Sequence, residues 1–346
     1  MKQSFRTLLL GIAACGTLAS LGWAGDWPQW RGPDRTDVST ETGLLAAWPA
    51  DGPELVWTFK DTGIGFSGPA VVDGTLYIMG ARKGVEQLLA IDVVEGKELW
   101  SLDVGEEFEI ARGNGPRSTP TVADGRVYAL GAKGNLVCAD ASDGRLLWKV
   151  SMSDLGGTPA EWGYCESVLV DGGNVICTPG GPKGAVAALD ARTGAVVWQS
   201  QEFTDPAQYA SPIVFDWAGI RQYVQLTMES LVGIRASDGK LLWKSDWPGR
   251  TAVIPTPVYR DGHVYITSGY GIGSKLVRLG QDHSVSDVYF NKVMKNQHGG
   301  VILIGDHLYG YSDNRGWTCQ DFKTGEAVWS EEEKLGKVSI AYADGR

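Results

Sequence analysis

The sequence predicts an all-β fold, a β-propeller built of four-stranded antiparallel blades. Three observations predict it: a Gly followed four residues later by Trp recurs five times, the consecutive Trp residues from Trp57 to Trp243 stand 43 to 50 residues apart, and each copy carries short alternating apolar runs. A period in the forties that carries strand patterns is typical of propeller blades. The five pairs are Gly96/Trp100, Gly144/Trp148, Gly194/Trp198, Gly239/Trp243 and Gly325/Trp329.

Each copy predicts four strands in a fixed order. A first apolar run ends in Asp-Gly, at 73–74, 124–125, 171–172 and 261–262, and a second alternating run follows. Asp-Gly between two such runs favours a tight hairpin, because Gly tolerates the positive φ that the turn needs. A third run ends in Asp, and a second tight turn leads into the fourth run, which carries the Trp. This large side chain is expected to fill the space between neighbouring blades and to act as scaffold.

The hairpins predict seven blades, with eight as an alternative. Blades are expected to start near Ser67, Ser118, Cys165, Ala210, Thr256 and Gly299, and a seventh run follows at 338–345. A degenerate copy around Tyr289–Phe290 fills the gap between Trp243 and Trp329.

Residues 54–59 resemble a fourth strand that lacks the three strands before it. We expect this segment to close the ring by pairing with residues near 339–343. The last blade would then be incomplete, without its middle two strands, as in a truncated chain.

Composition and the N-terminus indicate an exported acidic protein. The chain has 346 residues and a formal net charge of −10, so it repels phosphate backbones and no nucleic-acid partner is expected. Residues 1–24 are typical of a signal peptide, with two basic residues, an apolar run and small residues before Ala24. An alternative is lipidation at Cys15, which would be the chain's attachment to a membrane. The expected location is therefore the periplasm or cell envelope, with an extension over 25–52 and the propeller over 53–346.

Four further cysteines, Cys138, Cys165, Cys177 and Cys319, form no CxxC or CxxCH motif. An exported protein could pair them, but their spacing indicates no disulfide framework. We expect them to be buried thiols that pack as small apolar side chains.

The repeat resembles that of the pyrroloquinoline-quinone (PQQ) propeller family. Its fullest copy, at 187–198, reads Ala-Ala-Leu-Asp-Ala-Arg-Thr-Gly-Ala-Val-Val-Trp, and the opening Asp-Trp-Pro-Gln-Trp-Arg-Gly-Pro at 26–33 is similar to that of exported bacterial propellers with this repeat. The family includes quinoprotein alcohol dehydrogenases and the cofactor-free outer-membrane assembly lipoprotein BamB. The resemblance covers roughly 53–346 and implies the propeller fold.

The sequence departs from the quinoprotein enzymes in three respects. It has no adjacent cysteine pair, no CxxCH haem motif, and no Glu/Asn/Asp set that can be assigned to calcium. We therefore assign no cofactor, no metal site and no catalytic residue. PQQ with calcium remains the alternative that the resemblance implies.

The loops that join successive blades do not repeat, and they are expected to converge at one mouth of the central channel. They offer a candidate ligand site of Arg117, Trp162, Tyr164, Glu166 and His298. The planar Arg guanidinium suits a carboxylate or phosphate, and the aromatic rings supply a platform. His298 is the best acid–base candidate by residue type and Glu166 is next. The alternative is that these side chains only hydrogen-bond the loops to one another.

Together these observations predict an exported, non-catalytic binding or assembly scaffold. Its partner is expected to be a protein or a small polar or anionic ligand at the channel face. The alternative is a quinoprotein-like oxidoreductase of the alcohol dehydrogenase type, with PQQ and calcium at the channel mouth.

Overall fold

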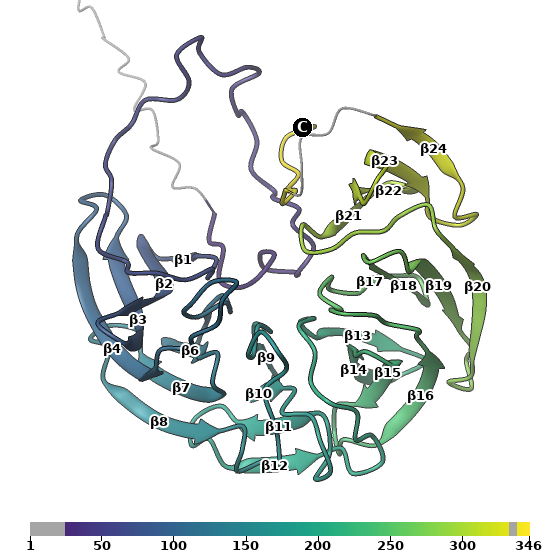
Figure 1. The fold of residues 1–346 in the computed structure, drawn as a ribbon, viewed down its shortest axis with the longest axis horizontal. Coiled ribbons are helices and arrows are strands. Elements are labelled where there is room, and N and C mark those ends of the chain that lie inside the picture. Colours follow the sequence, from purple (N-terminus) through teal and green to yellow (C-terminus); the bar gives the residue numbers. More distant parts are fainter. Residues whose placement is uncertain (1–24, 332–337) are drawn as a thin grey trace, which may run out of the picture.

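The computed structural model describes residues 25–331 and 338–346 and contains six four-stranded antiparallel sheets, with no helix among the described residues (Figure 1). The first sheet comprises β1 (Ala70–Val72), β2 (Thr75–Arg82), β3 (Val85–Asp92) and β4 (Glu98–Glu106). The second comprises β5 (Thr121–Ala123), β6 (Arg126–Leu130), β7 (Asn135–Asp140) and β8 (Leu146–Ser151). The third comprises β9 (Leu169–Asp171), β10 (Asn174–Cys177), β11 (Ala187–Asp190) and β12 (Val196–Gln199). The fourth sheet comprises β13 (Ile213–Trp217), β14 (Ile220–Leu226), β15 (Ser230–Arg235) and β16 (Leu241–Asp246). The fifth comprises β17 (Val258–Arg260), β18 (His263–Ser268), β19 (Gly273–Leu279) and β20 (Val285–Asn291). The sixth comprises β21 (Val301–Ile304), β22 (His307–Ser312), β23 (Gly316–Asp321) and β24 (Ala327–Ser330). The predicted all-β propeller is confirmed.

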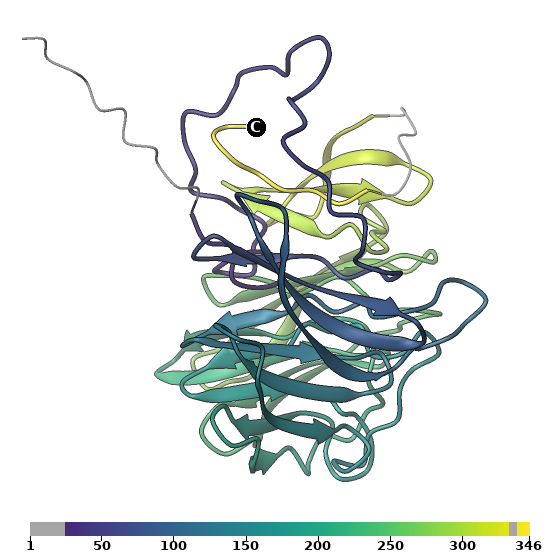
Figure 2. The same ribbon diagram turned by 90° about the vertical axis from the view of Figure 1, so that its left-hand side faces the viewer.

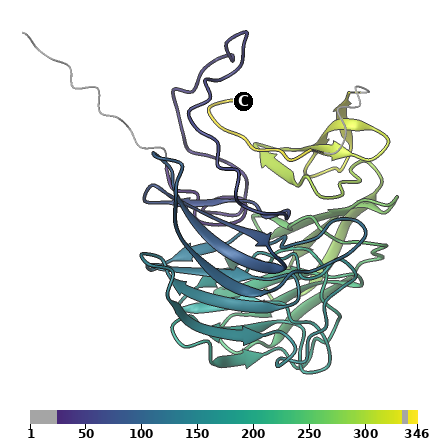
Figure 3. The same ribbon diagram turned by 60° about the vertical axis from the view of Figure 1, so that its left-hand side comes forward.

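The six sheets follow one another around a central channel. Figure 1 shows the first strands, such as β9 and β17, nearest the channel and the fourth strands, such as β12 and β20, on the outside. First strands of neighbouring sheets contact one another, as β1 does β5 and β5 does β9. The N-terminal extension and the C-terminal segment lie between the last sheet and the first, and Figures 2 and 3 show both projecting on the same side.

Three of the four expected Asp-Gly turns form as predicted, whereas at the fourth Asp171 pairs with Asn174 and the two turn residues are Gly172 and Gly173. Asp73, Asp124 and Asp261 have φ of 49°, 50° and 48°, each followed by a Gly with positive φ. The flanking residues pair directly across the turn, as Ala123 does with Arg126. This geometry is that of a two-residue hairpin loop, which suits the right-handed twist of the strands.

The repeated Trp side chains connect each sheet to the next. Trp100, Trp148 and Trp198 donate their indole N–H to Ala141 O, Ala191 O and Ala236 O at 3.1, 3.0 and 3.0 Å. Each acceptor lies just after the third strand of the following sheet. The indole ring also covers the turn Gly of that sheet, so that a Cβ on Gly144 would stand 2.5 Å from the ring of Trp100. We call this paired contact the tryptophan latch.

The fourth and fifth sheets make the contact to the next sheet with a different residue. In the fifth sheet, Tyr289 replaces Trp, donates to Phe322 O at 3.1 Å and covers Gly325, which confirms the degenerate copy. In the fourth sheet, Trp243 instead donates to Gln222 Oε1 of its own sheet at 2.6 Å. Trp217 of that sheet makes the contact to the next one, donating to Gly280 O at 2.9 Å.

The place for a seventh blade is only partly filled, and one detail of the expectation is wrong. Trp57 makes the latch to the first sheet, donating to Val93 O at 2.8 Å and covering Gly96. Residues 54–59 nevertheless form no strand and do not pair with 339–343. The C-terminal segment pairs instead with the N-terminal extension, through a parallel bridge between Val38 and Tyr342. No described strand lies between the two segments, so 54–59 has no neighbour to pair with.

The N-terminal extension runs across the channel and contacts each of the six sheets or the residues that lead directly into its first strand. Trp27 pairs with Val71, and Pro28 O accepts from Val122 N at 2.8 Å. Trp30 Nε1 donates to Thr256 Oγ1 at 2.9 Å, and Arg31 Nη2 donates to Val301 O at 2.6 Å. Arg35 donates to Ser167 O at 3.0 Å and Pro212 O at 2.9 Å, and also to Val168 O.

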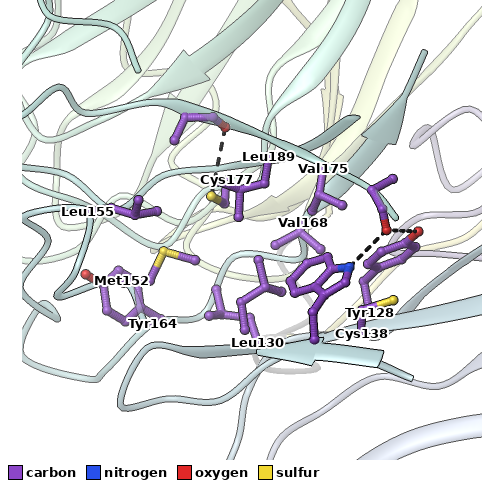
Figure 4. Packing of buried hydrophobic residues seen from close by; sticks show 14 of the residues in the cluster. Tyr128, Leu130, Cys138, Met152, Leu155, Tyr164, Val168, Val175, Cys177 and Leu189 are labelled. Atoms are coloured by element: carbon purple, nitrogen blue, oxygen red, sulfur yellow. Dashed lines mark hydrogen bonds between the residues drawn. The ribbon is translucent and has the colours of Figure 1, made fainter. Parts of the chain in front are cut away.

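The apolar core lies between neighbouring sheets. Figure 4 shows the cluster between the second and third sheets, where Tyr128 and Trp148 both donate to Ala191 O. Cys138 and Cys177 are buried in this cluster as free thiols, and burial raises the pKa of Cys138 to about 11. They pack as the small apolar side chains that the sequence indicates.

Among the described residues, no helix has the length and apolar character to span a membrane. The predicted signal peptide over 1–24, with Cys15, lies outside the described residues.

Candidate functional site

A cavity of about 740 Å³ opens where the chain enters the first strands of the sheets. We call it the mouth cavity. It is lined by residues of the N-terminal extension, the blade-joining loops and the C-terminal segment: Trp30, Phe66, Ser67, Gly68, Arg112, Arg117, Trp162, Cys165, Ser167, Tyr209, Ser211, Ala252, Ile254, Tyr270, Gln297, His298 and Ser339.

Hydrogen bonds of serine hydroxyls connect neighbouring sheets at the mouth cavity. Ser67 Oγ donates to Ser118 O at 2.7 Å, joining the first sheet to the second. Thr119 N donates to Ser167 Oγ at 2.9 Å, and Ser167 N donates to Ser211 Oγ at 2.9 Å, which continues the connection to the fourth sheet. The wall is therefore pre-formed, which lowers the ordering cost of binding.

Aromatic rings form much of the wall. Trp162 lies against Tyr209, with ring centroids 5.6 Å apart, and Tyr209 is 5% exposed. Tyr209 Oη accepts from Trp162 N at 3.3 Å. Trp30, held by its bond to Thr256, reaches the cavity from the extension. Such a wall suits a flat or apolar group with its polar end at the opening.

The two arginines of the cavity differ in how they are held. Arg117 Nη2 donates to Gly113 O at 2.5 Å, and another donor of the same guanidinium bonds Gly115 O. Its guanidinium also lies 5.4 Å from the ring centre of Phe66. Arg112 is exposed and lies 5.8 Å from the ring centre of Trp162. Arg112 therefore has more donors available to a ligand, whereas Arg117 fixes its own loop.

Three of the five residues predicted from sequence share this cavity, and two lie beneath it. Arg117, Trp162 and His298 line the wall, and His298 is exposed. Tyr164 and Glu166 are buried, and neither lines the cavity. Tyr164 Oη donates to Pro179 O at 2.9 Å.

Glu166 is occupied by protein groups. Its Oε1 accepts from Thr178 N at 2.5 Å, and Oε2 accepts from Gln225 Nε2 at 3.5 Å. Burial raises the pKa of Glu166 to about 7, while the Thr178 hydrogen bonds and the charge of Arg35 oppose that rise. The Glu166 carboxyl therefore connects protein groups in the interior and is not available as a base to a ligand in the cavity.

The side chains of the mouth cavity do not fit calcium. None of the described residues that line it is Asp or Glu, whereas Ca²⁺ is held by six to eight oxygens, carboxylates above all. Elsewhere in the described chain, no three His, Cys, Asp or Glu side chains gather in a metal-binding group. The described side chains of the mouth cavity therefore do not fit the calcium-dependent quinone group that the resemblance implies.

Cys165, the cysteine among the described lining residues, is not an activated nucleophile. Burial raises the pKa of the Cys165 thiol to about 12, so it stays protonated at neutral pH. The described wall thus combines aromatic rings, hydroxyls, two arginines and the imidazole of His298, which can bind a ligand and orient it.

Several lining residues were not found from sequence. Trp30 lies in the extension, Phe66 precedes the first strand, and Tyr270 lies in the β18–β19 turn. None belongs to a blade-joining loop of the kind expected to converge. The only sequence signal for Trp30 is its place in the 26–33 motif.

Comparison with known proteins agrees with the fold. The model of the family described as outer membrane protein assembly factor BamB matches residues 32–119 and 96–331. BamB of Moranella endobia is 26% identical over 70% of this chain and 59% of its own length. The dehydrogenase subunit of a quinone alcohol dehydrogenase from Komagataeibacter europaeus is 30% identical over 61% of this chain and 29% of its own length. The chain thus spans less than two thirds of either relative.

Solved structures resemble the fold at low identity. BamB from Moraxella catarrhalis aligns with a TM-score of 0.53 at 17% identity, covering 77% of this chain and 72% of its own. Quinohemoprotein alcohol dehydrogenase ADHIIG from Pseudomonas putida HK5 aligns with a TM-score of 0.55 at 15% identity, covering 92% and 74%. Because the family model matches well over half of the residues, this chain belongs to the BamB-like family of PQQ-repeat β-propellers.

Proposed function

We propose that this protein is an exported scaffold that binds a partner through the mouth cavity and catalyses no reaction. The observation that carries the proposal is the composition of that cavity. Aromatic rings and two arginines line it, and no carboxylate stands among the described lining residues to hold calcium or act as a base. These are the elements of recognition.

The expected ligand is a carboxylate next to an apolar or aromatic group, on a partner protein or on a small anion. Arg112 supplies the charge and the Trp162–Tyr209 pair supplies the platform. A protein partner is favoured because the matched family and several relatives are named as assembly factors. The same naming favours a place in the periplasm or cell envelope, reached through the signal at 1–24 or a lipid on Cys15.

A binding experiment tests this proposal. The probe is a short peptide with Phe beside Asp, compared with the same peptide carrying Asn instead of Asp. We expect the Asp peptide to bind several-fold more tightly and to lose that advantage at high salt, because an exposed Arg–carboxylate pair is screened.

Arg112→Ala should abolish the preference for Asp. The matched control is Arg278→Ala, an exposed Arg on β19 that does not line the cavity. Equal binding of the Asp and Asn peptides to the unaltered protein, or a preference that survives Arg112→Ala, would count against this site.

The alternative is a quinoprotein-like oxidoreductase. It is favoured by the matches to quinone alcohol dehydrogenase subunits and opposed by the composition of the mouth cavity. PQQ supplies two-electron oxidation of an alcohol where calcium holds it. Titration with PQQ and Ca²⁺, read by dye-linked alcohol oxidation, distinguishes the two functions.

A further inference from the structure

A second cavity, of about 480 Å³, runs beside the first strands β13, β17 and β21 of three neighbouring sheets (Figure 1). Its other wall is the turn of the N-terminal extension at 31–36. This cavity, which we call the extension cavity, shares none of its described lining residues with the mouth cavity. Its volume lies within the range of small-molecule sites. A ligand in the extension cavity would therefore be separate from the one proposed for the mouth cavity.

Arg31 lines the extension cavity with an incompletely bonded guanidinium. Its side chain is 1% exposed, Nε donates to Asp37 Oδ2 at 2.5 Å, and Nη2 donates to Val301 O at 2.6 Å. Nη1 is buried and has no hydrogen-bond acceptor among the described residues. A buried donor without an acceptor loses the free energy of its hydration, and the loss is larger for a charged group. An acceptor supplied by a ligand would remove that cost.

Arg35 is the other buried arginine of this cavity, and its hydrogen bonds are complete. Each of its three nitrogens donates to a described oxygen, for example Nε to Gln29 Oε1 at 3.0 Å and Nη1 to Ser167 O at 3.0 Å. The same turn of the extension therefore satisfies one buried guanidinium and leaves one nitrogen of the other unpaired. The missing acceptor is specific to Arg31 and does not follow from how the extension packs.

The buried charges beside the cavity favour an anion over a neutral acceptor. Arg31 is paired with Asp37, which offsets one of the two buried cations. The carboxyl beside Arg35 is Glu166, and burial raises the pKa of Glu166 to about 7, so it is ionised only in part at neutral pH. The two guanidinium groups thus exceed the negative charge around them. One further negative charge would complete the balance.

The rest of the cavity determines which anion fits. Apolar side chains from all three first strands line it: Val214, Val258 and Leu303. The charged groups at its rim are the exposed Asp34 and Arg260, which is paired with the exposed Asp306, so solvent screens them. A single unpaired donor suits one carboxylate oxygen, whereas a phosphate dianion would bury more oxygens without donors. A carboxylate on a short apolar chain matches both the donor and the wall.

We propose that the extension cavity binds a carboxylate carried on a short apolar chain. One carboxylate oxygen accepts from Arg31 Nη1, and the chain lies against β13, β17 and β21. Nη1 is closed to solvent, so the carboxylate displaces a neighbouring side chain of the wall as it binds. Because the ligand binds the folded chain, it also raises the melting temperature in proportion to its saturation of the site.

A titration followed by NMR chemical shifts tests this proposal. The probe is hexanoate, compared with hexanamide, which has the same length and no charge, and with inorganic phosphate. Every titration uses protein that carries Arg112→Ala, because this change removes the side chain proposed to bind carboxylates in the mouth cavity. We expect saturable shifts of the amides at 31–37 and 258–260, with a Kd for hexanoate about tenfold below that for hexanamide. Phosphate should cause no saturable shift there.

Two variants locate the site from opposite walls. Arg31→Gln removes the charge and Nη1 and should weaken hexanoate binding by about tenfold or more. Val258→Phe fills the cavity and leaves Arg31 intact, so the test does not depend on whether Arg31→Gln folds; it should block binding. The matched control is Val94→Phe, at a position that is 69% exposed and does not line the cavity, and it should bind hexanoate normally.

Several outcomes would overturn the proposal. Hexanoate binding that survives Val258→Phe or a folded Arg31→Gln protein places the carboxylate elsewhere, as do shifts confined to the mouth cavity. A lack of saturable shifts at 31–37 shows that the cavity takes no such ligand. Equal affinity for hexanamide or for phosphate contradicts the carboxylate assignment. None of these results bears on the proposed function, because Arg112 is absent throughout and the mouth cavity is tested with the Asp peptide.

Discussion

At the residue scale, one side chain repeated around the ring explains how the sheets hold together. An indole combines a large apolar surface with one N–H donor, so it can bury its ring on a Gly and bond a carbonyl in the same contact. Trp148 shows both halves, with its ring against Gly194 and its N–H on Ala191 O. The sequence predicts these residues as scaffold because they repeat.

Trp148→Ala should lower the free energy of unfolding by about 3–5 kcal/mol, because a buried aromatic side chain leaves a cavity. Urea denaturation followed by circular dichroism gives the value. Val94→Ala is the control, since Val94 is 69% exposed. Equal midpoints for both variants would mean that the latch carries no stability.

The residue scale also explains why Tyr164 and Glu166 were misplaced from sequence. Residues 164–167 lie just before β9, and side chains alternate between two sides where a chain runs in the direction of a strand. Cys165 and Ser167 face the mouth cavity, so Tyr164 and Glu166 face the interior. The sequence shows that the loop is polar and aromatic, but which alternate side chains face the channel depends on how the loop enters the strand.

Glu166 should make stability depend on pH. Its folded pKa, about 7, lies above that of an unfolded Glu, so its contribution is complete below the unfolded value of about 4.3 and is lost as pH rises through 7. The free energy of unfolding of the unaltered protein should therefore fall relative to Glu166→Gln between about pH 4.5 and 7. Denaturation curves at a series of pH values measure this. A constant difference between the two proteins across that range would contradict a raised pKa.

At the scale of strands and turns, the sequence predicts best those features that depend on the turns. The Asp-Gly hairpins, the four-strand order and the degenerate copy at Tyr289 all follow from local pattern, because each depends on residues close in sequence. The pairing of 54–59 could not be predicted, because it depends on which other strands are present. The extension across the channel could not be predicted either, since its contacts join residues far apart in sequence, such as Arg31 and Val301, which are 270 positions apart.

Turn glycines that receive a Trp should be less replaceable than turn glycines that do not. Gly144 and Gly84 both have positive φ, 73° and 82°, so Ala costs roughly 1 kcal/mol of backbone strain at either place. A Cβ on Gly144 would stand 2.5 Å from the Trp100 ring, whereas nothing lies within 4 Å of one on Gly84.

Gly144→Ala should therefore be less stable than Gly84→Ala by a further 1–3 kcal/mol, roughly the cost of overpacking. Thermal melts of the two variants measured side by side give the comparison. Equal losses would show that the Trp100 ring moves away freely.

At the scale of the whole molecule, the extension joins the six sheets from inside the channel. Arg35 is 4% exposed and bonds carbonyls that precede the third and fourth sheets. Burial lowers its pKa to about 9, opposed by the charge of Glu166, so it remains a cation at neutral pH. The ring is thus fixed at its rim by the latches and at its centre by this segment.

Arg35→Ala should cost about 3–5 kcal/mol, because it leaves the buried carbonyls of Ser167 and Pro212 without this donor and Glu166 without its counter-charge. Differential scanning calorimetry should show a lower melting temperature than for Arg192→Ala, an exposed Arg on a β11–β12 turn. Matching melts would mean that the extension is not part of the cooperative unit.

The proposed function requires that the mouth cavity recognises a ligand and holds no redox cofactor. The most direct measurement titrates one protein preparation with the Asp peptide and, separately, with PQQ and Ca²⁺, following binding by calorimetry and alcohol oxidation with an artificial dye. We expect salt-sensitive binding of the peptide that depends on Arg112, and no saturable Ca²⁺-dependent binding of PQQ. Saturable PQQ binding that requires Ca²⁺ and brings dye-linked alcohol oxidation would contradict it.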